Sequence, residues 1–337
     1  MTQSYLNEEQ AQQAARDIQI LRQALQQVLF GQETLIDFVV TGLLARGHLL
    51  LEGLPGLGKT QLVKGLSLAL GLDTKRIQFT PDLLPGDITG NPVLQERDGA
   101  REFVFQPGPL FSNLVLADEI NRASPKTQSA LLEAMQERCV TVLGTTHPLP
   151  SPFFVLATQN PIELEGTYPL PEAQLDRFLF KLEVLRNPTA TLEQIVLKRE
   201  LGTEPVVEQA MTPEAFSKLI DLTRQVYLPD VVANFIARLV NATHPGESEN
   251  ATNLKFGASP RAALSLASAA KAHALLNGRP NASFEDVRLL APAVMAHRVV
   301  LDYRAKLEGL TTRKVIAEIV AEVPDQATET PKTLKEA

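Results

Sequence analysis

Residues 48–70 constrain the fold of this chain more than any other segment. They read HLLLEGLPGLGKTQLVKGLSLAL: a short apolar run, a loop with three glycines, and an amphipathic stretch that ends at Gly71. In a strand–loop–helix unit of this kind, the backbone N–H groups of the loop and the positive end of the helix converge on phosphate oxygens. The segment therefore predicts an α/β fold built around a phosphate-binding loop.

The loop fills the pattern G-x-x-x-x-G-K-[ST] with Gly53, Gly58, Lys59 and Thr60. Lys59 can bridge the outer phosphates and Thr60 can hold Mg²⁺, so the pattern predicts a site for ATP with its metal. A chance match is disfavoured because the strand and helix that the pattern requires stand on either side of it. The residues assigned to nucleotide binding are Gly53, Leu54, Pro55, Gly56, Leu57, Gly58, Lys59, Thr60 and Gln61.

The chain has 337 residues, of which 44% are hydrophobic and 21% charged, enough for a globular protein of two domains. Cys139 is the single cysteine, so no intramolecular disulfide is available, which fits a reducing compartment. The polar N-terminus lacks a signal-peptide core, and charged residues interrupt the apolar stretch around Val39 before it reaches spanning length. We expect a cytoplasmic protein without membrane insertion. The net charge of −7 also argues against nucleic acid as a partner.

Five short apolar runs, separated at several points by helical patterns, predict a parallel sheet covered on both faces. Asp98-Gly99 and Gly144-Thr145 lie between strand-like segments and predict two inserted β-hairpins. From about Thr189 onward only helices are expected, with starts at Ser259-Pro260 and at the capping box Ser283–Asp286. The expected strands are 48–51, 76–80, 113–117, 153–158 and 178–185.

Asp118 and Glu119 follow the apolar strand 113–117. A carboxylate at the carboxyl end of a buried strand beside the phosphate loop is suited to the Mg²⁺ shell, and its neighbour can act as the general base for an attacking water. An acidic pair that merely ends a strand at the surface is the alternative. We assign Asp118 with Thr60 to the metal and Glu119 to catalysis.

Four further polar residues have open interpretations. Asn160 can position a water or simply start the Asn-Pro turn, and Gln32 can border the adenine or lie in a plain loop between helices 8–29 and 33–45. Arg177 can pair with a nearby carboxylate, or complete a neighbouring subunit's site in a ring. Arg261 stands in the first turn of a helix, where a cation is disfavoured, so either a bound phosphate or a carboxylate should offset it.

The segments GLPGLGKT, LVLADEINRA, ATQNP, PEAQLDRF and SPRA occur here in the order in which they stand in the MoxR family of AAA+ ATPases, and the chain resembles that family over residues 20–320. The resemblance implies an AAA+ α/β domain with a small all-α lid, ATP hydrolysis, homo-hexameric rings and chaperone-like remodelling of partner proteins, often with von Willebrand factor A domains. It makes Gly53–Thr60 the Walker A loop, Asp118 and Glu119 Walker B, Asn160 sensor 1, Arg177 the arginine finger and Arg261 sensor 2. Arg122 belongs to the family motif, as an interface residue or a helix cap.

The domains expected are an α/β nucleotide-binding domain at 1–188, a helical lid at 189–323, and a polar, disordered tail at 324–337. Three functions fit this plan. The favoured one is a ring ATPase that remodels proteins; the alternatives are the ATPase subunit of a metal chelatase and a nucleic-acid motor or loader.

Overall fold

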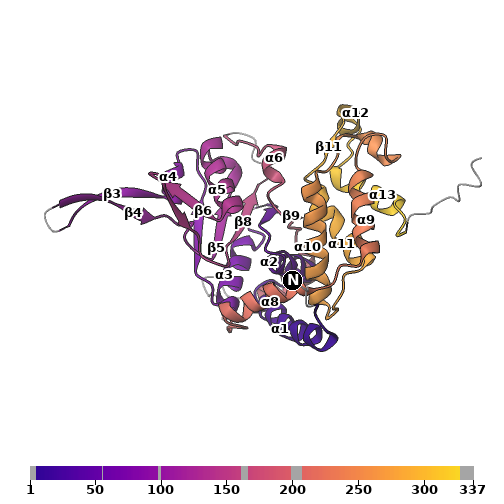
Figure 1. The fold of residues 1–337 in the computed structure, drawn as a ribbon, viewed down its shortest axis with the longest axis horizontal. Helices are drawn as coiled ribbons and strands as arrows, with labels where there is room; N and C mark the ends of the chain where they lie inside the picture. The colour runs from indigo at the N-terminus through magenta and orange to yellow at the C-terminus, as the bar shows by residue number, and fades with distance from the viewer. Residues whose placement is uncertain (1–4, 55, 98–99, 161–165, 199–206, 327–337) are drawn as a thin grey trace, which may run out of the picture. The chain divides into compact units, whose positions relative to one another are not determined.

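The computed structural model describes residues 5–326, apart from 55, 98–99, 161–165 and 199–206. Gln13–Leu222 forms one compact unit, and the chain from Thr223 onward, with the residues before Gln13, forms a second. This division falls later than the domain boundary expected at 188/189, so two helices expected in the lid, α7 and most of α8, belong to the first unit. Figure 1 shows the elements of both units.

The first unit contains the five-stranded parallel sheet that the sequence predicts, in the order β2-β5-β8-β1-β9. All strand pairs in it are parallel. Its strands are β1 (Leu49–Glu52), β2 (Thr74–Gln78), β5 (Leu114–Asp118), β8 (Phe154–Gln159) and β9 (Phe180–Glu183). Its helices are α1 (Glu8–Gln26, which begins before the division), α2 (Glu33–Leu44), α3 (Lys59–Leu70), α4 (Pro85–Thr89), α5 (Pro125–Glu137), α6 (Glu172–Leu175), α7 (Thr189–Lys198) and α8 (Pro213–Gln225, which crosses it).

Apolar side chains cover both faces of the sheet. On one face, Leu50, Val115 and Val155 pack with Leu131 and Met135 of α5 in a single buried cluster. Successive strand residues point to opposite faces, so the neighbours of these residues lie on the other side of the sheet. There α3 packs on β5, and α2 comes so close that a Cβ at Gly42 would lie 2.5 Å from Leu49 Cδ2. The unit is therefore a three-layer α/β sandwich.

The parallel register brings the carboxyl ends of four strands to one edge of the sheet. Gln78 stands opposite Asp118, and Glu52 stands opposite Gln159. Ala117 and Leu50 are both level with Ala157 of β8. Polar residues that follow β1, β2, β5 and β8 are consequently close neighbours, as is usual for ligand sites in open α/β sheets.

Two antiparallel hairpins are inserted into this unit, as predicted. Strands β3 (Gly90–Arg97) and β4 (Ala100–Pro107) pair along their whole length and extend as an arm in Figure 1; the turn predicted at Asp98-Gly99 lies outside the described residues. Strands β6 (Cys139–Val142) and β7 (Thr145–Pro148) are joined by Leu143-Gly144, both with positive φ. The His147 ring stacks on Phe105 with 4.1 Å between ring centroids, so the two hairpins touch.

The described part of the second unit is mainly helical. Strands β10 (Leu254–Phe256) and β11 (Val300–Leu301) form a short antiparallel pair that the sequence does not predict, because so few residues show no recognisable alternation. The capping box predicted at Ser283 is present: Ser283 Oγ accepts from the Asp286 N–H, and the Asp286 carboxylate accepts from the Ser283 N–H. The helices are α9 (Asp230–Asn241), α10 (Pro260–Leu276), α11 (Phe284–Met295), α12 (Tyr303–Leu307) and α13 (Thr312–Glu322).

The end of α13 is fixed by two arginines of the same unit. Arg238 donates to the carbonyl oxygens of Pro324 and Asp325, and Arg288 donates to the Asp325 carboxylate at 2.7 Å. Pro324 and Asp325, which fall in the tail predicted to be disordered, are therefore held by these contacts, and residues 327–337 lie outside the described residues. Within the described part of the chain, no helix combines the length and apolar character needed to cross a membrane.

Candidate active site

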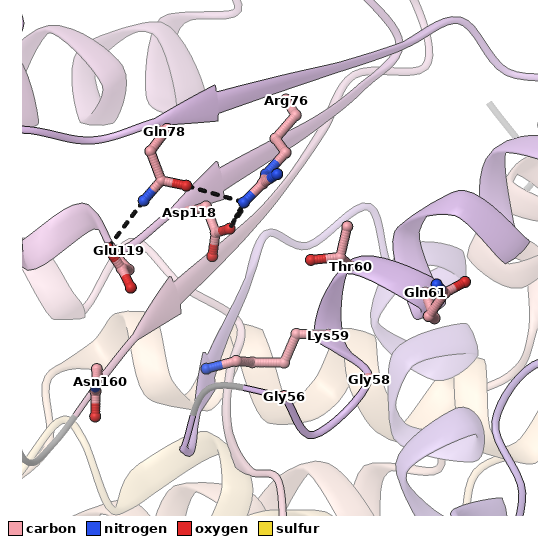
Figure 2. Close-up of a pocket in the computed structure, with 10 residues that line it drawn as sticks. All are labelled: Gly56, Gly58, Lys59, Thr60, Gln61, Arg76, Gln78, Asp118, Glu119 and Asn160. Carbon is pink, nitrogen blue, oxygen red and sulfur yellow. Dashed lines mark hydrogen bonds and ion pairs between the residues drawn. The ribbon is translucent and has the colours of Figure 1, made fainter. Parts of the chain in front are cut away.

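A pocket of about 400 Å³ lies at the carboxyl edge of the sheet in the first unit (Figure 2). Strands β2, β5 and β8 contribute polar side chains from one side, and the start of α3 with its preceding loop closes the other. Eight of the residues predicted for the site lie together here: Gly56, Gly58, Lys59, Thr60, Gln61, Asp118, Glu119 and Asn160. Arg76 and Gln78, which the sequence analysis did not assign, complete the lining.

Gly53 and Gly58 stand where a larger residue would clash or be strained. A Cβ at Gly53 would lie 2.8 Å from the carbonyl oxygen of Val184, which follows β9. Gly58 has φ +87° at the N-cap of α3, in the left-handed region that other residues adopt at a cost. Because the first N–H groups of a helix have no partner within the helix, the start of α3 presents free backbone donors to the pocket. This geometry suits an anion.

Lys59 is the cation of the loop. Figure 2 shows its side chain extending across the pocket toward the strand ends that carry Glu119 and Asn160, and its Nζ donates to the Gly53 carbonyl oxygen at 2.6 Å. Partial burial lowers the pKa of Lys59 from its ordinary value, while the carboxylates of Asp118, Glu119 and Glu52 act in the opposite direction. A bound phosphate would favour the charged ammonium in the same way as these carboxylates.

The residues present fit a magnesium nucleotide. Thr60 and Asp118 offer a hydroxyl and a carboxylate on facing sides of the pocket, and oxygen donors of this kind are what Mg²⁺ prefers. The described residues hold no cluster of three or more metal-binding side chains, so phosphate oxygens and water would supply the remaining ligands, as is usual for Mg²⁺. The buried Gln61 Oε1 has no hydrogen-bond partner among the described residues, which leaves an acceptor for a ligand or water.

Asp118 is held by two neighbouring strands. Its Oδ1 accepts a 2.6 Å hydrogen bond from the Thr158 hydroxyl of β8. Its Oδ2 accepts from Arg76 of β2, with 2.7 Å to Nη2 and 3.2 Å to Nε. The Thr158 hydroxyl also accepts the Glu119 N–H at 2.8 Å, so this one buried side chain fixes both acidic residues.

Glu119 has an uncommon backbone conformation for a residue with a side chain, with φ 56° and ψ 50°. This left-handed conformation costs about 1–2 kcal/mol, and strain of this kind gathers at functional sites. The carboxylate is 22% exposed, and its Oε2 accepts 2.9 Å hydrogen bonds from Gln78 Nε2 and from Arg122 Nη1. Arg122 thus lies against Glu119 within one chain; its suggested roles in an interface or as a helix cap stay predictions.

Asn160 follows β8, is buried, and lines the pocket on the side of the strand ends (Figure 2). Its carbonyl oxygen accepts from Asn121 Nδ2 at 3.5 Å, which links the ends of β5 and β8. An amide at this position can orient a water molecule. The pocket therefore combines a cationic phosphate cradle, a metal-type donor pair, a carboxylate and an amide.

The other assigned residues lie outside the pocket lining. Gln32 is the N-cap residue of α2, and its amide donates to Asn187 Oδ1 at 3.0 Å. Leu29, in the turn before Gln32, lies beside the phosphate loop, since its Cδ2 would be 3.0 Å from a Cβ at Gly58. Arg177 is half-buried just before β9. Arg261 is exposed in the first turn of α10, in the second unit. Pro55 falls outside the described residues.

Arg76 and Gln78 are the lining residues that sequence reasoning missed. They alternate on β2, whose pattern TKRIQ buries only Ile77. The exposed polar residues near the carboxyl end of that strand are the available signal. Their significance depends on β2 lying directly beside β5, and that order is not written in the local sequence.

Comparison with known proteins agrees with this architecture. Residues 48–180 match the "ATPase family associated with various cellular activities (AAA)", and residues 246–319 match the AAA lid domain. The two matches follow one another along the chain as an α/β nucleotide-binding domain and then a helical lid. A crystal structure of a candidate ATPase from Cytophaga hutchinsonii is similar with a TM-score of 0.86 and 39% identity, covering 94% of this chain and 97% of the other.

Two curated relatives extend the comparison over most of the sequence. The uncharacterised protein YeaC of Bacillus subtilis is 45% identical over 89% of this chain and 92% of its own length. The chaperone MoxR1 of Mycobacterium tuberculosis is 41% identical over 93% of this chain and 84% of its own length. The chain belongs to the MoxR family of AAA+ ATPases.

Proposed function

We propose that the chain hydrolyses ATP with Mg²⁺, as the subunit of a homo-hexameric ring that remodels partner proteins in the cytoplasm. The observation that carries the proposal is the convergence of Lys59, Thr60, Asp118, Glu119 and Asn160 on one pocket beside a glycine-shaped helix start.

Each residue has a distinct part in the proposed reaction. The residues Gly53 to Gln61 cradle the phosphates, and Lys59 neutralises the outer ones. Thr60 and Asp118 would hold Mg²⁺, which neutralises charge on the phosphate oxygens when it is bound. Glu119 accepts a proton from the attacking water, and Asn160 orients that water. The products are ADP and phosphate.

Two arginines lie outside the pocket lining and are proposed to act through assembly and closure. Arg177 is assigned to the γ-phosphate of a neighbouring subunit, where a guanidinium supplied in trans stabilises charge in the transition state. Arg261 is assigned to the phosphates when the lid closes on the nucleotide. Gln32 is proposed to border the adenine, because the turn before it lies beside the phosphate loop at Gly58.

Remodelling of a partner protein is favoured over the alternatives by the relative named chaperone MoxR1. Because the chain resembles MoxR proteins, we propose that the partner carries a von Willebrand factor A domain. The net charge of −7 supports a protein partner over nucleic acid. Co-purification with a chelatase subunit, or stimulation of hydrolysis by DNA, would support the two alternative functions instead.

Phosphate release from ATP by the full-length chain tests the proposal. We expect hydrolysis that needs Mg²⁺ and disappears in Lys59→Ala, because the ammonium that holds the outer phosphates is gone. Lys64→Ala is the matched control, since it removes an exposed lysine from the same helix. Absence of Mg²⁺-dependent hydrolysis in the wild type, or full activity in Lys59→Ala, would overturn the proposal.

A further inference from the structure

Arg76 is a second guanidinium in the candidate active site, and it contacts the carboxylate assigned to the metal. Its Nη2 lies 2.7 Å from Asp118 Oδ2, and its Nε donates to the same oxygen. The Arg76 side chain is 54% exposed, whereas the Asp118 side chain is 14% exposed. Figure 2 shows the guanidinium pointing at Asp118 from the edge strand β2. The cation is therefore much more exposed to solvent than the carboxylate that it contacts.

Hydrogen bonds from Arg76 and Thr158 occupy most of the lone-pair sites of the Asp118 carboxylate. Asp118 Oδ1 is occupied by the Thr158 hydroxyl, and Asp118 Oδ2 takes two N–H groups from Arg76. A metal ion that approaches this carboxylate, directly or through a bound water, meets a positive charge already in place. Two cations at one carboxylate repel each other, so the metal gains less there than at a free aspartate.

Arg76 also links the two acidic residues. Its Nη2 donates to Gln78 Oε1 at 2.9 Å, and Gln78 Nε2 donates to Glu119 Oε2 at 2.9 Å. Glu119 has a guanidinium of its own in Arg122. Each carboxylate therefore has a cationic partner without any metal, which offsets the repulsion between two adjacent negative charges.

We propose that Arg76 is the resident counterion of Asp118 and that it competes with Mg²⁺ for this carboxylate, so that it sets the Mg²⁺ concentration at which the nucleotide site loads with metal. The inference rests on the proposed function, because it assumes a magnesium nucleotide in this pocket. Arg76 is a positioning residue for the metal site.

The test is a Mg²⁺ titration of the full chain with a fluorescently labelled ADP, after its binding in EDTA has been measured. Arg76→Gln removes the charge, and Arg76→Lys keeps it. Lys75→Gln is the matched control, because it removes the same charge from the adjacent exposed residue of β2, which points to the other face of the sheet and does not line the pocket.

We expect Arg76→Gln to lower the half-saturating Mg²⁺ concentration by roughly 1.5- to 5-fold, the range of one exposed ion pair. In EDTA the same variant should bind labelled ADP more weakly, since Asp118 then repels the phosphates without its counterion. Arg76→Lys and Lys75→Gln should stay near the wild type. In Arg76→Gln the affinity for Mg²⁺ thus rises while the affinity for metal-free ADP falls. A purely structural role of Arg76 would not produce these opposite changes.

An unchanged or higher Mg²⁺ requirement in Arg76→Gln overturns the inference, as does an equal shift in Lys75→Gln. If the wild type binds no labelled ADP with or without Mg²⁺, the proposed function fails and the inference fails with it. Thermal unfolding of each variant without nucleotide checks folding, and Arg76→Met replaces Arg76→Gln if the latter does not fold.

Discussion

At the scale of single residues, Glu119 is the proposed general base. Its carboxylate is placed by a strained backbone, by the Thr158 hydroxyl that holds its N–H, and by side-chain contacts to Gln78 and Arg122. A carboxylate oriented on both sides in this way can act as a base without first reorganising. The proposed role of Glu119 as base therefore depends on the charge of its side chain more than on the shape of that side chain.

The substitution Glu119→Gln separates these two properties. Glutamine can keep the hydrogen bonds to Gln78 and Arg122 but cannot accept the proton of the attacking water, so we expect ATP binding close to wild type and turnover lower by roughly 10²–10⁴-fold. Equilibrium binding of labelled ATP and single-turnover hydrolysis measure the two effects. Glu133→Gln, an exposed glutamate on α5, is the control. Wild-type turnover in Glu119→Gln would remove its role as base.

We expect His48 to make the free energy of unfolding depend on pH. The side chain is buried at the start of β1: Nδ1 accepts the Val155 N–H at 3.0 Å, and Nε2 donates to the Met135 carbonyl oxygen at 3.1 Å. Burial lowers the pKa of His48 from 6.5 to about 4, against the opposing effect of the Met135 carbonyl and with a smaller contribution from Arg138. The fold therefore favours the neutral ring.

The direction of this pH effect follows from proton linkage. Between pH 6.5 and about 4 the unfolded chain binds the proton of His48 and the folded chain does not, so its contribution is complete above pH 6.5 and is lost as the pH falls toward 4. The loss is about 3 kcal/mol for this one group. We expect urea unfolding of His48→Gln to show a shallower pH dependence in this range, and the exposed His244→Gln to match the wild type. An unchanged slope in His48→Gln would contradict the assignment.

At the scale of elements, the start of α11 is held by a cluster of hydrogen bonds around Asp286. Asp286 is almost completely buried and accepts from His273, Arg279 and Ser283. Burial alone would raise the pKa of Asp286, but these hydrogen bonds hold it well below its usual range. An ionised carboxylate at a helix N-terminus also interacts favourably with the helix dipole.

Replacing Asp286 with asparagine leaves Arg279 and His273 without their charged partner and weakens the cap of α11. We expect a loss on the order of 2–4 kcal/mol in the free energy of unfolding. Asp302→Asn is the matched control, because Asp302 caps α12 through the Arg304 N–H and should cost about 1 kcal/mol or less. Chemical denaturation monitored by circular dichroism measures both. Equal losses in the two variants would contradict the account.

The sequence predicted those elements whose signal is local. The capping box at Ser283, the hairpin at Gly144 and the helix end at Gly71 depend on residues within a few positions of one another, and the structure confirms all three. The strand pair β10–β11 was not predicted, because its two short strands are far apart in the chain. The left-handed backbone of Glu119 was not predicted because no glycine marks it in the sequence, and the N–H of Glu119 is bound by Thr158 of another strand.

The same distinction applies to the candidate site. The sequence identifies four of the site residues by their spacing or by their place at a strand end: Lys59, Thr60, Asp118 and Glu119. Arg76 contributes as closely to the pocket, but only because β2 is the neighbour of β5. Pairing between distant strands is a property of the whole sheet, so residues of this kind are found from the structure.

At the scale of the whole molecule, the proposed mechanism requires more than one copy of the chain. The described pocket lining contains Lys59 and Arg76 as cations, and Arg177 lies outside it. If Arg177 serves the nucleotide of a neighbour, each site in a ring consists of one subunit's phosphate loop and the next subunit's arginine. Neither subunit alone would complete the site.

Complementation between two inactive variants tests this claim most directly. Lys59→Ala cannot hold ATP but retains Arg177, and Arg177→Ala holds ATP but cannot complete its neighbour's site. Random mixing in equal amounts creates about a quarter of interfaces with an intact loop facing an intact arginine. We therefore expect the mixture to recover up to about a quarter of wild-type ATP hydrolysis, while each variant alone stays inactive. Activity of the mixture no greater than the sum of its inactive components, with rings formed, would contradict the account.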